Sequence, residues 1–407
     1  VLALAVNVLL GRMLGAAEYG HYMTLLSGAL ILGGLAARGS DQLLTRELAA
    51  GAADNAEWRH VLKRWAVKRT AIGVALAGLV YLIWLFISET SRSVGYLSPT
   101  ALAGVLLITL SVICALAAGA LNGFAASMRS QSLVVVKNVV ILVSLGIFWW
   151  FLGRIHAAWM ALWLQVGGYA IAFVVGWYWF HTVAASPLGS NSVVAVAGNL
   201  STKRWSSTAH HFLLVGIAAL LVNRLDVVLV SGLAGNETAG IYVAGARLAQ
   251  LALMVALAVN VVLSPRISSA WAQKDHAAVQ RLLRSGLMFT VPVAVIEVAV
   301  VALFGRDIVA LFGPAYAQSA MPLFWVTLAY ALWTVAAPGY ALLAMTGSEK
   351  VVAGLSWLVV ITNVGAILVL VPLDGATGAG LAMTIGYGLS FPALVIAIQK
   401  QLLTHAE

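Results

Sequence analysis

The sequence predicts an all-α integral membrane protein with about 12 transmembrane helices, arranged in two six-helix lobes related by a parallel internal repeat. Of its 407 residues, 62% are hydrophobic and only 9% are charged, whereas about a quarter of a soluble domain is charged. Apolar stretches of roughly 20 residues, the length that crosses a ~30 Å hydrocarbon core, recur along the chain. The two halves also repeat residues at one constant offset.

Short polar connections separate the predicted spans. The first span ends near residue 10, and the others cover 19–37, 70–88, 100–124, 132–153, 157–183, 208–233, 238–263, 285–304, 319–345, 351–372 and 376–399. We interpret these runs as helices because backbone in lipid must satisfy its hydrogen bonds within each segment. Only about ten apolar residues precede Arg12, half of what a span requires. We therefore expect the chain to lack the beginning of its first helix.

Lysine and arginine are distributed unevenly among the connections. One alternate set holds sixteen of these residues and the opposite set holds four, while Arg38, Arg224 and Arg247 lie within spans. The positive-inside rule then places the C-terminus in the cytoplasm. We expect a multi-pass protein of the bacterial inner membrane. The net charge of +9 does not predict nucleic-acid binding, because the basic residues lie in these short connections.

An offset of 220 residues relates the two halves. It pairs Gly15 with Gly235, Gly20 with Gly240, Tyr22 with Tyr242, Arg46 with Arg266, and Arg64 with Arg284. Duplicated six-helix units are typical of transporters, and an even number of helices makes the repeat parallel, about an axis normal to the membrane. The predicted domains are an N-terminal lobe at 1–183, a cytoplasmic linker at 184–207 and a C-terminal lobe at 208–407.

A basic amphipathic segment follows the second helix of each half. Asp54 and Asp275 begin these segments, and apolar residues then recur at helical spacing beside arginine and lysine. We expect both to form helices on the anionic cytoplasmic leaflet. Two interpretations are open, a membrane anchor or a surface that captures substrate.

The single cysteine, Cys114, lies in an apolar run. It excludes an internal disulfide and a cysteine-based metal site. We expect no catalytic residue, no metal and no cofactor, and the protein is not expected to be an enzyme.

Five segments resemble one transporter family. They are LLGRMLGAAEYGHY at 9–22, GLAARGSDQLLTREL at 34–48, RLDVVLVSGLAGNETAGIYVAGARL at 224–248, LSPRIS at 263–268 and LFGPAY at 311–316. In order and spacing they resemble the polysaccharide flippase branch of the multidrug/oligosaccharidyl-lipid/polysaccharide superfamily. The resemblance implies two lobes around a central cavity and export of O-antigen or capsule repeat units on undecaprenyl diphosphate by alternating access. It also implies coupling to a proton or sodium gradient, although Ala37 stands where many relatives have an acidic residue.

Charged side chains within spans are the candidates for substrate binding. Such charges cost about 2.5–3.5 kcal/mol and usually face the protein interior, and the planar fork of arginine pairs well with phosphate oxygens. Arg38 and Asp41 share a helix face, so they form either a self-neutralised pair or a ligand contact. Arg224 and Asp226 point to different sides of a helix and each needs another partner.

Three further residues complete the candidate list. Arg247 has no acidic residue three or four positions away, so it forms either a salt bridge between lobes or an anion site. Lys137 either snorkels to the interface or binds substrate. Glu297 lies well inside a span. Its carboxyl group either has a structural role, held by hydrogen bonds, or carries the protons that drive transport.

The predicted cargo is therefore an undecaprenyl-diphosphate-linked oligosaccharide, moved by a monomer among membrane lipids beside polysaccharide polymerase machinery. Two alternatives use the same scaffold, a cation-coupled drug exporter and a peptidoglycan-precursor flippase. An integral membrane polysaccharide polymerase or ligase is the remaining alternative, but the outward connections are short and carry no cluster of catalytic side chains.

Overall fold

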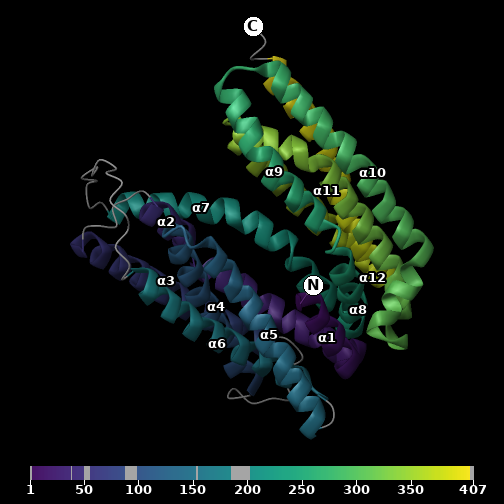
Figure 1. Ribbon diagram of the computed structural model, residues 1–407. Coiled ribbons are helices and arrows are strands. Elements are labelled where there is room, and N and C mark those ends of the chain that lie inside the picture. The colour runs from purple at the N-terminus through teal and green to yellow at the C-terminus, as the bar shows by residue number, and fades with distance from the viewer. Residues whose placement is uncertain are drawn as a thin grey trace. The chain divides into compact units, whose positions relative to one another are not determined.

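The computed structural model describes residues 2–37, 39–49, 56–87, 99–152, 155–184 and 202–403. The regular elements of these ranges are all helical (Figure 1), which confirms the predicted fold class. They are α1 (Leu2–Ala37), α2 (Ser40–Ala49), α3 (Ala56–Ile87), α4 (Pro99–Gly123), α5 (Ser127–Leu152), α6 (Ala158–Ala184), α7 (Thr202–Val222), α8 (Leu225–Ala249), α9 (Leu253–Ala272), α10 (His276–Val309), the short 3-10 helices η3 (Ala310–Phe312) and η4 (Pro314–Ser319), α11 (Ala320–Met345) and α12 (Glu349–Leu403).

Within the described residues, nine helical segments are long and apolar enough to cross a membrane. Three of them contain a glycine with a positive φ, at Gly15, Gly235 and Gly375. Each of these glycines lies between two predicted spans. The protein is therefore a multi-pass membrane protein, and the count of twelve crossings stays a prediction.

The chain reverses direction at each of these glycines and forms a helical hairpin. Gly15 has φ 75° and ψ 172°, and Gly235 has φ 85° and ψ 170°, a region that is essentially restricted to glycine. Beyond Gly375, Gly378 lies against the backbone carbonyl of Leu370. Eight residues of straight helix would separate these two by about 12 Å, so the chain must reverse.

The chain divides into two compact units. Unit 1 comprises Val1–Val6 and Leu25–Leu220, and unit 2 comprises Asn7–Thr24 and Leu221–Glu407. In unit 1, α4 packs against α2, α3, α5 and α6, and in unit 2, α11 packs against α8, α9, α10 and α12. The predicted lobe boundary at 184–207 stays a prediction, because most of that segment lies outside the described residues.

A close contact between two helix backbones in unit 2 is evidence for the internal repeat. A side-chain carbon added at Gly20 would meet the carbonyl oxygen of Asn236, and one added at Gly240 would meet the carbonyl oxygen of Ala16. Ala16 and Asn236 are themselves 220 residues apart. Such a reciprocal contact is what a two-fold repeat produces, and glycine permits it because two helix backbones approach closely there.

The seventh and eighth predicted spans, 208–233 and 238–263, are wrong as continuous helices. The first is interrupted at Asn223–Arg224, between α7 and α8, and the second at residues 250–252, between α8 and α9. Hydropathy does not detect these interruptions, because apolar residues such as Leu251 and Ala252 continue through the second one.

The prediction that the two basic segments form separate surface helices is also wrong. The described part of the first basic segment belongs to α3, which continues through Thr70 to Ile87. The second belongs to α10, where Asp275 caps the helix by accepting the Ala278 N–H at 2.8 Å. Apolar residues at helical spacing on both sides of each boundary leave nothing to end the helix. Asp54 lies outside the described residues.

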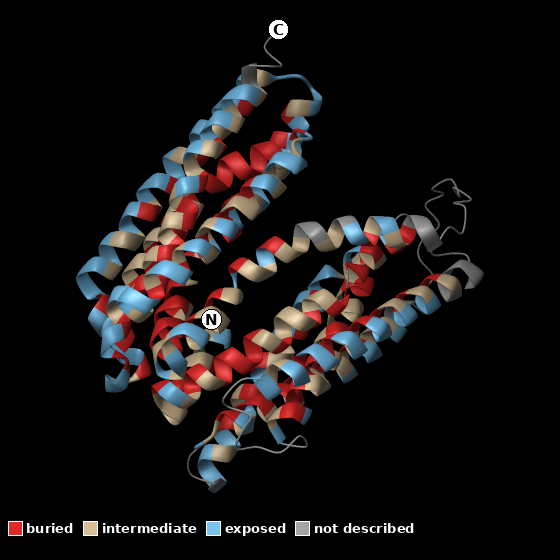
Figure 2. Cartoon of the chain, turned by 180° about the vertical axis from the view of Figure 1, so that it is seen from behind, coloured by how far each residue is buried: buried red, intermediate tan, exposed pale blue. Residues whose placement is uncertain are grey.

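Exposed positions, pale blue in Figure 2, occur along the long helices, and many of them hold apolar side chains. Trp150 is 81% exposed, Leu303 76% and Val261 74%, which in a membrane protein is contact area for lipid. Buried positions hold alanine, leucine, valine and isoleucine together with tyrosines such as the fully buried Tyr19 and Tyr242.

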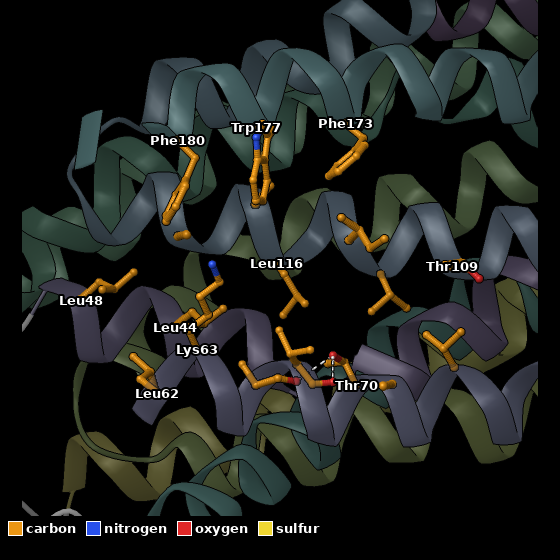
Figure 3. Close-up of a pocket in the computed structure, with 18 of the residues that line it drawn as sticks. Leu44, Leu48, Leu62, Lys63, Thr70, Thr109, Leu116, Phe173, Trp177 and Phe180 are labelled. Atoms are coloured by element: carbon orange, nitrogen blue, oxygen red, sulfur yellow. Dashed lines mark hydrogen bonds between the residues drawn. The ribbon is translucent and has the colours of Figure 1, made fainter. Parts of the chain in front are cut away.

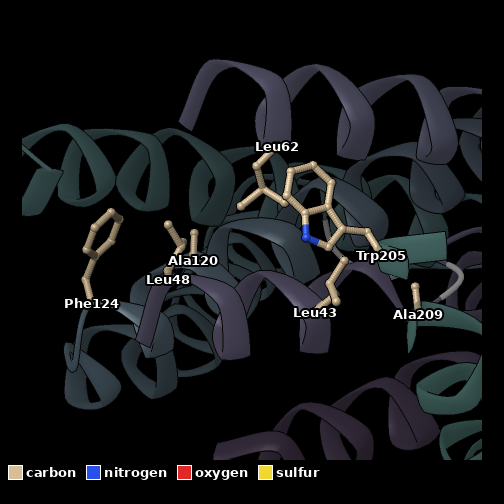
Figure 4. Close-up of a cluster of buried hydrophobic side chains, with 7 residues drawn as sticks. All are labelled: Leu43, Leu48, Leu62, Ala120, Phe124, Trp205 and Ala209. Atoms are coloured by element: carbon tan, nitrogen blue, oxygen red, sulfur yellow. The ribbon is translucent and has the colours of Figure 1, made fainter. Parts of the chain in front are cut away.

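A buried cluster joins the basic end of α3 to α2, α4 and α7 within unit 1 (Figure 4). Its members are Leu43, Leu48, Leu62, Ala120, Phe124, Trp205 and Ala209. Beside it, the Trp65 ring lies 5.9 Å from that of Trp205, and its indole N–H donates to Ser206 Oγ at 3.2 Å. The cluster fixes the start of α3 against its neighbours.

Candidate functional site

The two ends of α8 lie at one depth. The helix begins at Leu225, reverses at Gly235 and ends at Ala249. Arg224 and Arg247 are each about 17 Å from Gly235 along the helix axes, at 1.5 Å per residue. If Gly235 lies at one face of a ~30 Å core, both arginines lie near the middle. Transporters commonly bind their substrates at such interruptions, where freed backbone groups and helix ends meet.

Asp226 and Tyr242 link the two arms of this hairpin. The Tyr242 hydroxyl donates to Asp226 Oδ2 at 2.5 Å, and Asp226 Oδ1 accepts the Val227 N–H at 2.8 Å. Asp226 is 6% exposed and Tyr242 is fully buried. Both carboxylate oxygens of Asp226 are therefore occupied within the protein, and this residue positions the hairpin.

Arg247 lies in the last turn of the same helix, where a positive charge is favoured by the helix dipole. Its Nη1 donates to Gln250 Oε1 at 3.0 Å, whereas its Nε is buried and has no hydrogen-bond partner among the described residues. Its charge acts on Tyr19, Asp226 and Tyr242. No carboxylate of the described residues forms an ion pair with it, so its guanidinium retains donors for another anion.

Arg224 lies next to this network but not in a helix. It occupies the turn before α8, with φ −145° and ψ −26°, so the predicted two-residue helical relation to Asp226 does not apply. The Arg224 charge nevertheless acts on Asp226. The structure therefore brings together three of the predicted residues, Arg224, Asp226 and Arg247.

The candidates of unit 1 have different surroundings. Lys137 Nζ lies 4.7 Å from the centre of the Tyr169 ring, a cation–π contact between α5 and α6. Asp41 is half-buried in the first turn of α2, and burial raises the pKa of its carboxyl group. Arg38, its predicted partner, lies outside the described residues.

Glu297 lies in α10, apart from the α8 hairpin along the chain. Its Oε2 is buried and has no hydrogen-bond partner among the described residues, although the adjacent Ile296 is 59% exposed. The role of Glu297 in proton coupling stays a prediction.

Two residues of the network, Gln250 and Tyr242, are not among the predicted site residues. Gln250 follows Arg247 by three positions inside an apolar run, and that spacing was a usable signal, because residues three apart share a helix face. Tyr242 entered only as half of the repeat pair with Tyr22. Its bond to Asp226 crosses the hairpin, and no local sequence pattern reports such a contact.

The comparisons with known proteins agree with this architecture. The family described as "Polysaccharide biosynthesis protein" matches residues 1–271, and no curated protein matches the chain. An inward-facing multidrug resistance MATE family transporter of the MOP superfamily is similar in structure, with a TM-score of 0.73 and 14% identity over 100% of this chain and 94% of that chain.

Two other solved structures have the same fold. The lipid II flippase MurJ, in an inward closed conformation, has a TM-score of 0.64 and 13% identity over 99% of this chain and 87% of its own. A Vibrio cholerae MATE transporter, VcmN, has a TM-score of 0.61 and 16% identity over 99% of this chain and 92% of its own. These identities show a shared fold only, that of transporters and flippases. The family match, which covers well over half of the sequence, confirms the resemblance of the motifs, and the chain belongs to the polysaccharide biosynthesis protein family, with the fold of the MATE and MurJ transporters.

Proposed function

We propose that this protein moves undecaprenyl-diphosphate-linked oligosaccharide repeat units from the inner to the outer leaflet of a bacterial cytoplasmic membrane. Its product serves O-antigen and lipopolysaccharide or capsule assembly, and the mechanism is alternating access. The family description supports the polysaccharide context. A structural neighbour named as a lipid II flippase supports a lipid-linked cargo.

The observation that carries the proposal is the state of Arg247. An arginine at mid-membrane depth costs about 2.5–3.5 kcal/mol on insertion scales, and here its Nε has no protein partner among the described residues. A diphosphate offers several oxygens to a planar guanidinium and forms charge-assisted hydrogen bonds with it. The cost is offset when the diphosphate headgroup passes this level of the membrane.

The other predicted residues complete the proposal. Asp226 holds Tyr242 and the hairpin, while Arg224 adds positive potential next to Arg247. Arg38, Asp41 and Lys137 are proposed to contact substrate in the remainder of its path, and Glu297 to carry the coupling proton. The C-terminus is proposed to be cytoplasmic, and the protein to act as a monomer beside the polymerase that consumes its product, without covalent chemistry of its own.

The direct test is transport in proteoliposomes loaded with a fluorescent undecaprenyl-diphosphate oligosaccharide. Arg247→Ala should lower the initial flipping rate about tenfold or more, because charge-assisted hydrogen bonds contribute about 1.5–3 kcal/mol. Arg247→Lys should recover part of the rate, since it restores charge without the fork. The matched control is Arg281→Ala, which removes an exposed arginine near the start of α10 whose only described ion pair is with Asp275 at 3.9 Å.

Four results would contradict the proposal. Equal rates for wild type and Arg247→Ala would remove Arg247 from the substrate path. Transport of lipid II but not of repeat units would favour a peptidoglycan-precursor flippase, and uptake of cationic drugs alone would favour a drug exporter. Polymerised glycan formed by the purified protein would favour the polymerase or ligase alternative.

A further inference from the structure

A groove of about 890 Å³ lies within unit 1, lined by residues of α2, α3, α4 and α6. Figure 3 shows Phe173, Trp177 and Phe180 in a row on α6, facing Leu62 and Thr70 of α3 across the space, with Leu116 of α4 between them. The lining is almost entirely apolar. A water-filled polar passage for sugar would need hydrogen-bonding groups along its length, so this groove suits a hydrocarbon chain.

The groove has the length of one membrane leaflet. Its lining along α3 extends from Leu62 to Ala75, which is about 20 Å of helix. Half of a ~30 Å hydrocarbon core is about 15 Å. An acyl chain of one leaflet therefore fits along it, whereas an undecaprenyl chain of eleven isoprene units is longer than the lined surface.

One end of the groove is cationic and open. Lys63 is exposed, and its Nζ points into the space, 5.9 Å from the centre of the Trp177 ring (Figure 3). Arg64 and Lys68 follow on the same helix, and Trp177 is 49% exposed. A lysine beside a half-exposed tryptophan at the end of an apolar surface is the arrangement that meets lipid headgroups at an interface.

We infer that this groove binds one acyl chain of an anionic phospholipid from the leaflet at the basic end of α3, with its phosphate at Lys63. The occupant is a membrane lipid and not the transported substrate. It fills the space between α3 and α6 and holds these two helices at a fixed separation. The charge of Lys63, 5.9 Å from Trp177, selects an anionic headgroup over a zwitterionic one.

The test is native mass spectrometry of the detergent-purified full chain, titrated separately with phosphatidylglycerol, phosphatidylethanolamine and undecaprenyl phosphate. Wild type should retain one phosphatidylglycerol in preference to the other two. Lys63→Ala should weaken this binding about fivefold, the contribution of one lysine near an anionic surface. Lys68→Ala, five residues along the same helix and absent from the groove lining, is the matched control and should change it less than twofold.

A second variant tests the groove itself. Ala117→Phe places a ring in the lining of α4 and should abolish retention of the lipid. Its elution volume in size-exclusion chromatography should match that of wild type, and if it does not fold, the Lys63 and Lys68 pair still decides the matter. No retained phosphatidylglycerol in wild type, equal losses in the two lysine variants, or preferential retention of undecaprenyl phosphate would each overturn the inference. The last of these would assign the groove to the substrate tail.

Discussion

The first hairpin of the chain and the hairpin of α8 share a backbone and a tyrosine hydrogen bond across the reversal, from Tyr19 to Asn7 in the first and from Tyr242 to Asp226 in the second, but they differ in buried charge. Gly15 and Gly235 have nearly the same dihedral angles, and Gly20 and Gly240 contact the opposite hairpin reciprocally. Yet α1 continues after Gly15 without another interruption to Ala37, whereas α8 ends at Ala249 and a turn precedes α9. The duplication therefore retained the reversal and the contact, whereas the break at residues 250–252 has no counterpart at residues 30–32 of α1.

The side chains differ at equivalent positions of the repeat. Asp226, Arg247 and Gln250 of the second copy correspond, at the offset of 220, to Val6, Ser27 and Leu30 of the first. One copy thus presents apolar and small side chains where the other presents a carboxylate, a guanidinium and an amide. The repeat thus supplies the scaffold, and among the described residues these charged side chains stand in the second copy.

The reciprocal glycine contact provides the largest expected effect. Gly20→Ala and Gly240→Ala each place a carbon against a backbone carbonyl, and overpacking of this kind costs about 3 kcal/mol. Both should lower the Tm of the purified protein by similar amounts. Gly365→Ala, a helical position with open space around it, should leave the Tm unchanged or raise it. A large loss at only one of the two positions would show that the contact is not two-fold.

Loss of the hydrogen bond between Tyr242 and Asp226 should have the second-largest effect on stability. Tyr242→Phe leaves a buried carboxylate without one of its two partners, which costs about 2 kcal/mol of the free energy of unfolding. The double variant Asp226→Val with Tyr242→Phe gives the second copy the Val6 of the first. It should recover part of that loss, because it removes the buried carboxylate together with its tyrosine partner, while the Val227 N–H loses its acceptor. Denaturant titration of the single and double variants checks this, and an additive further loss in the double variant would contradict it.

The two hairpin glycines should give the smallest effect. Alanine at Gly15 or Gly235 must adopt a φ of 75° or 85°, which costs about 1–2 kcal/mol for a residue with a side chain. Neither glycine has an atom near the added carbon, so the backbone conformation alone determines the cost. Equal losses of thermal stability are expected in the two variants, and a twofold difference would indicate that the hairpins are not equivalent.

Much of the fold could be predicted from local sequence. The hydropathy of a segment is enough to predict a transmembrane helix, because each such helix satisfies its backbone hydrogen bonds internally. The repeat was visible because glycine is needed where φ is positive or where two backbones touch, and these needs recur at Gly15 and Gly235 or at Gly20 and Gly240. The N-terminal cap at Asp275 was equally local. Each of these features depends on a few neighbouring residues and their types.

The tertiary structure decided where the helices end within the membrane and which side chains meet. Residues 250–252 include no proline or glycine, so their composition predicts an uninterrupted helix. The Asp226–Tyr242 bond and the groove at Lys63 unite residues that are distant in sequence, from two arms of a hairpin or from four helices. Packing between segments fixes such contacts, and hydropathy averages over each segment separately. The sequence by itself thus determined a duplicated membrane transporter scaffold, while its interior charges acquired their neighbours only through the folding of one helix against another.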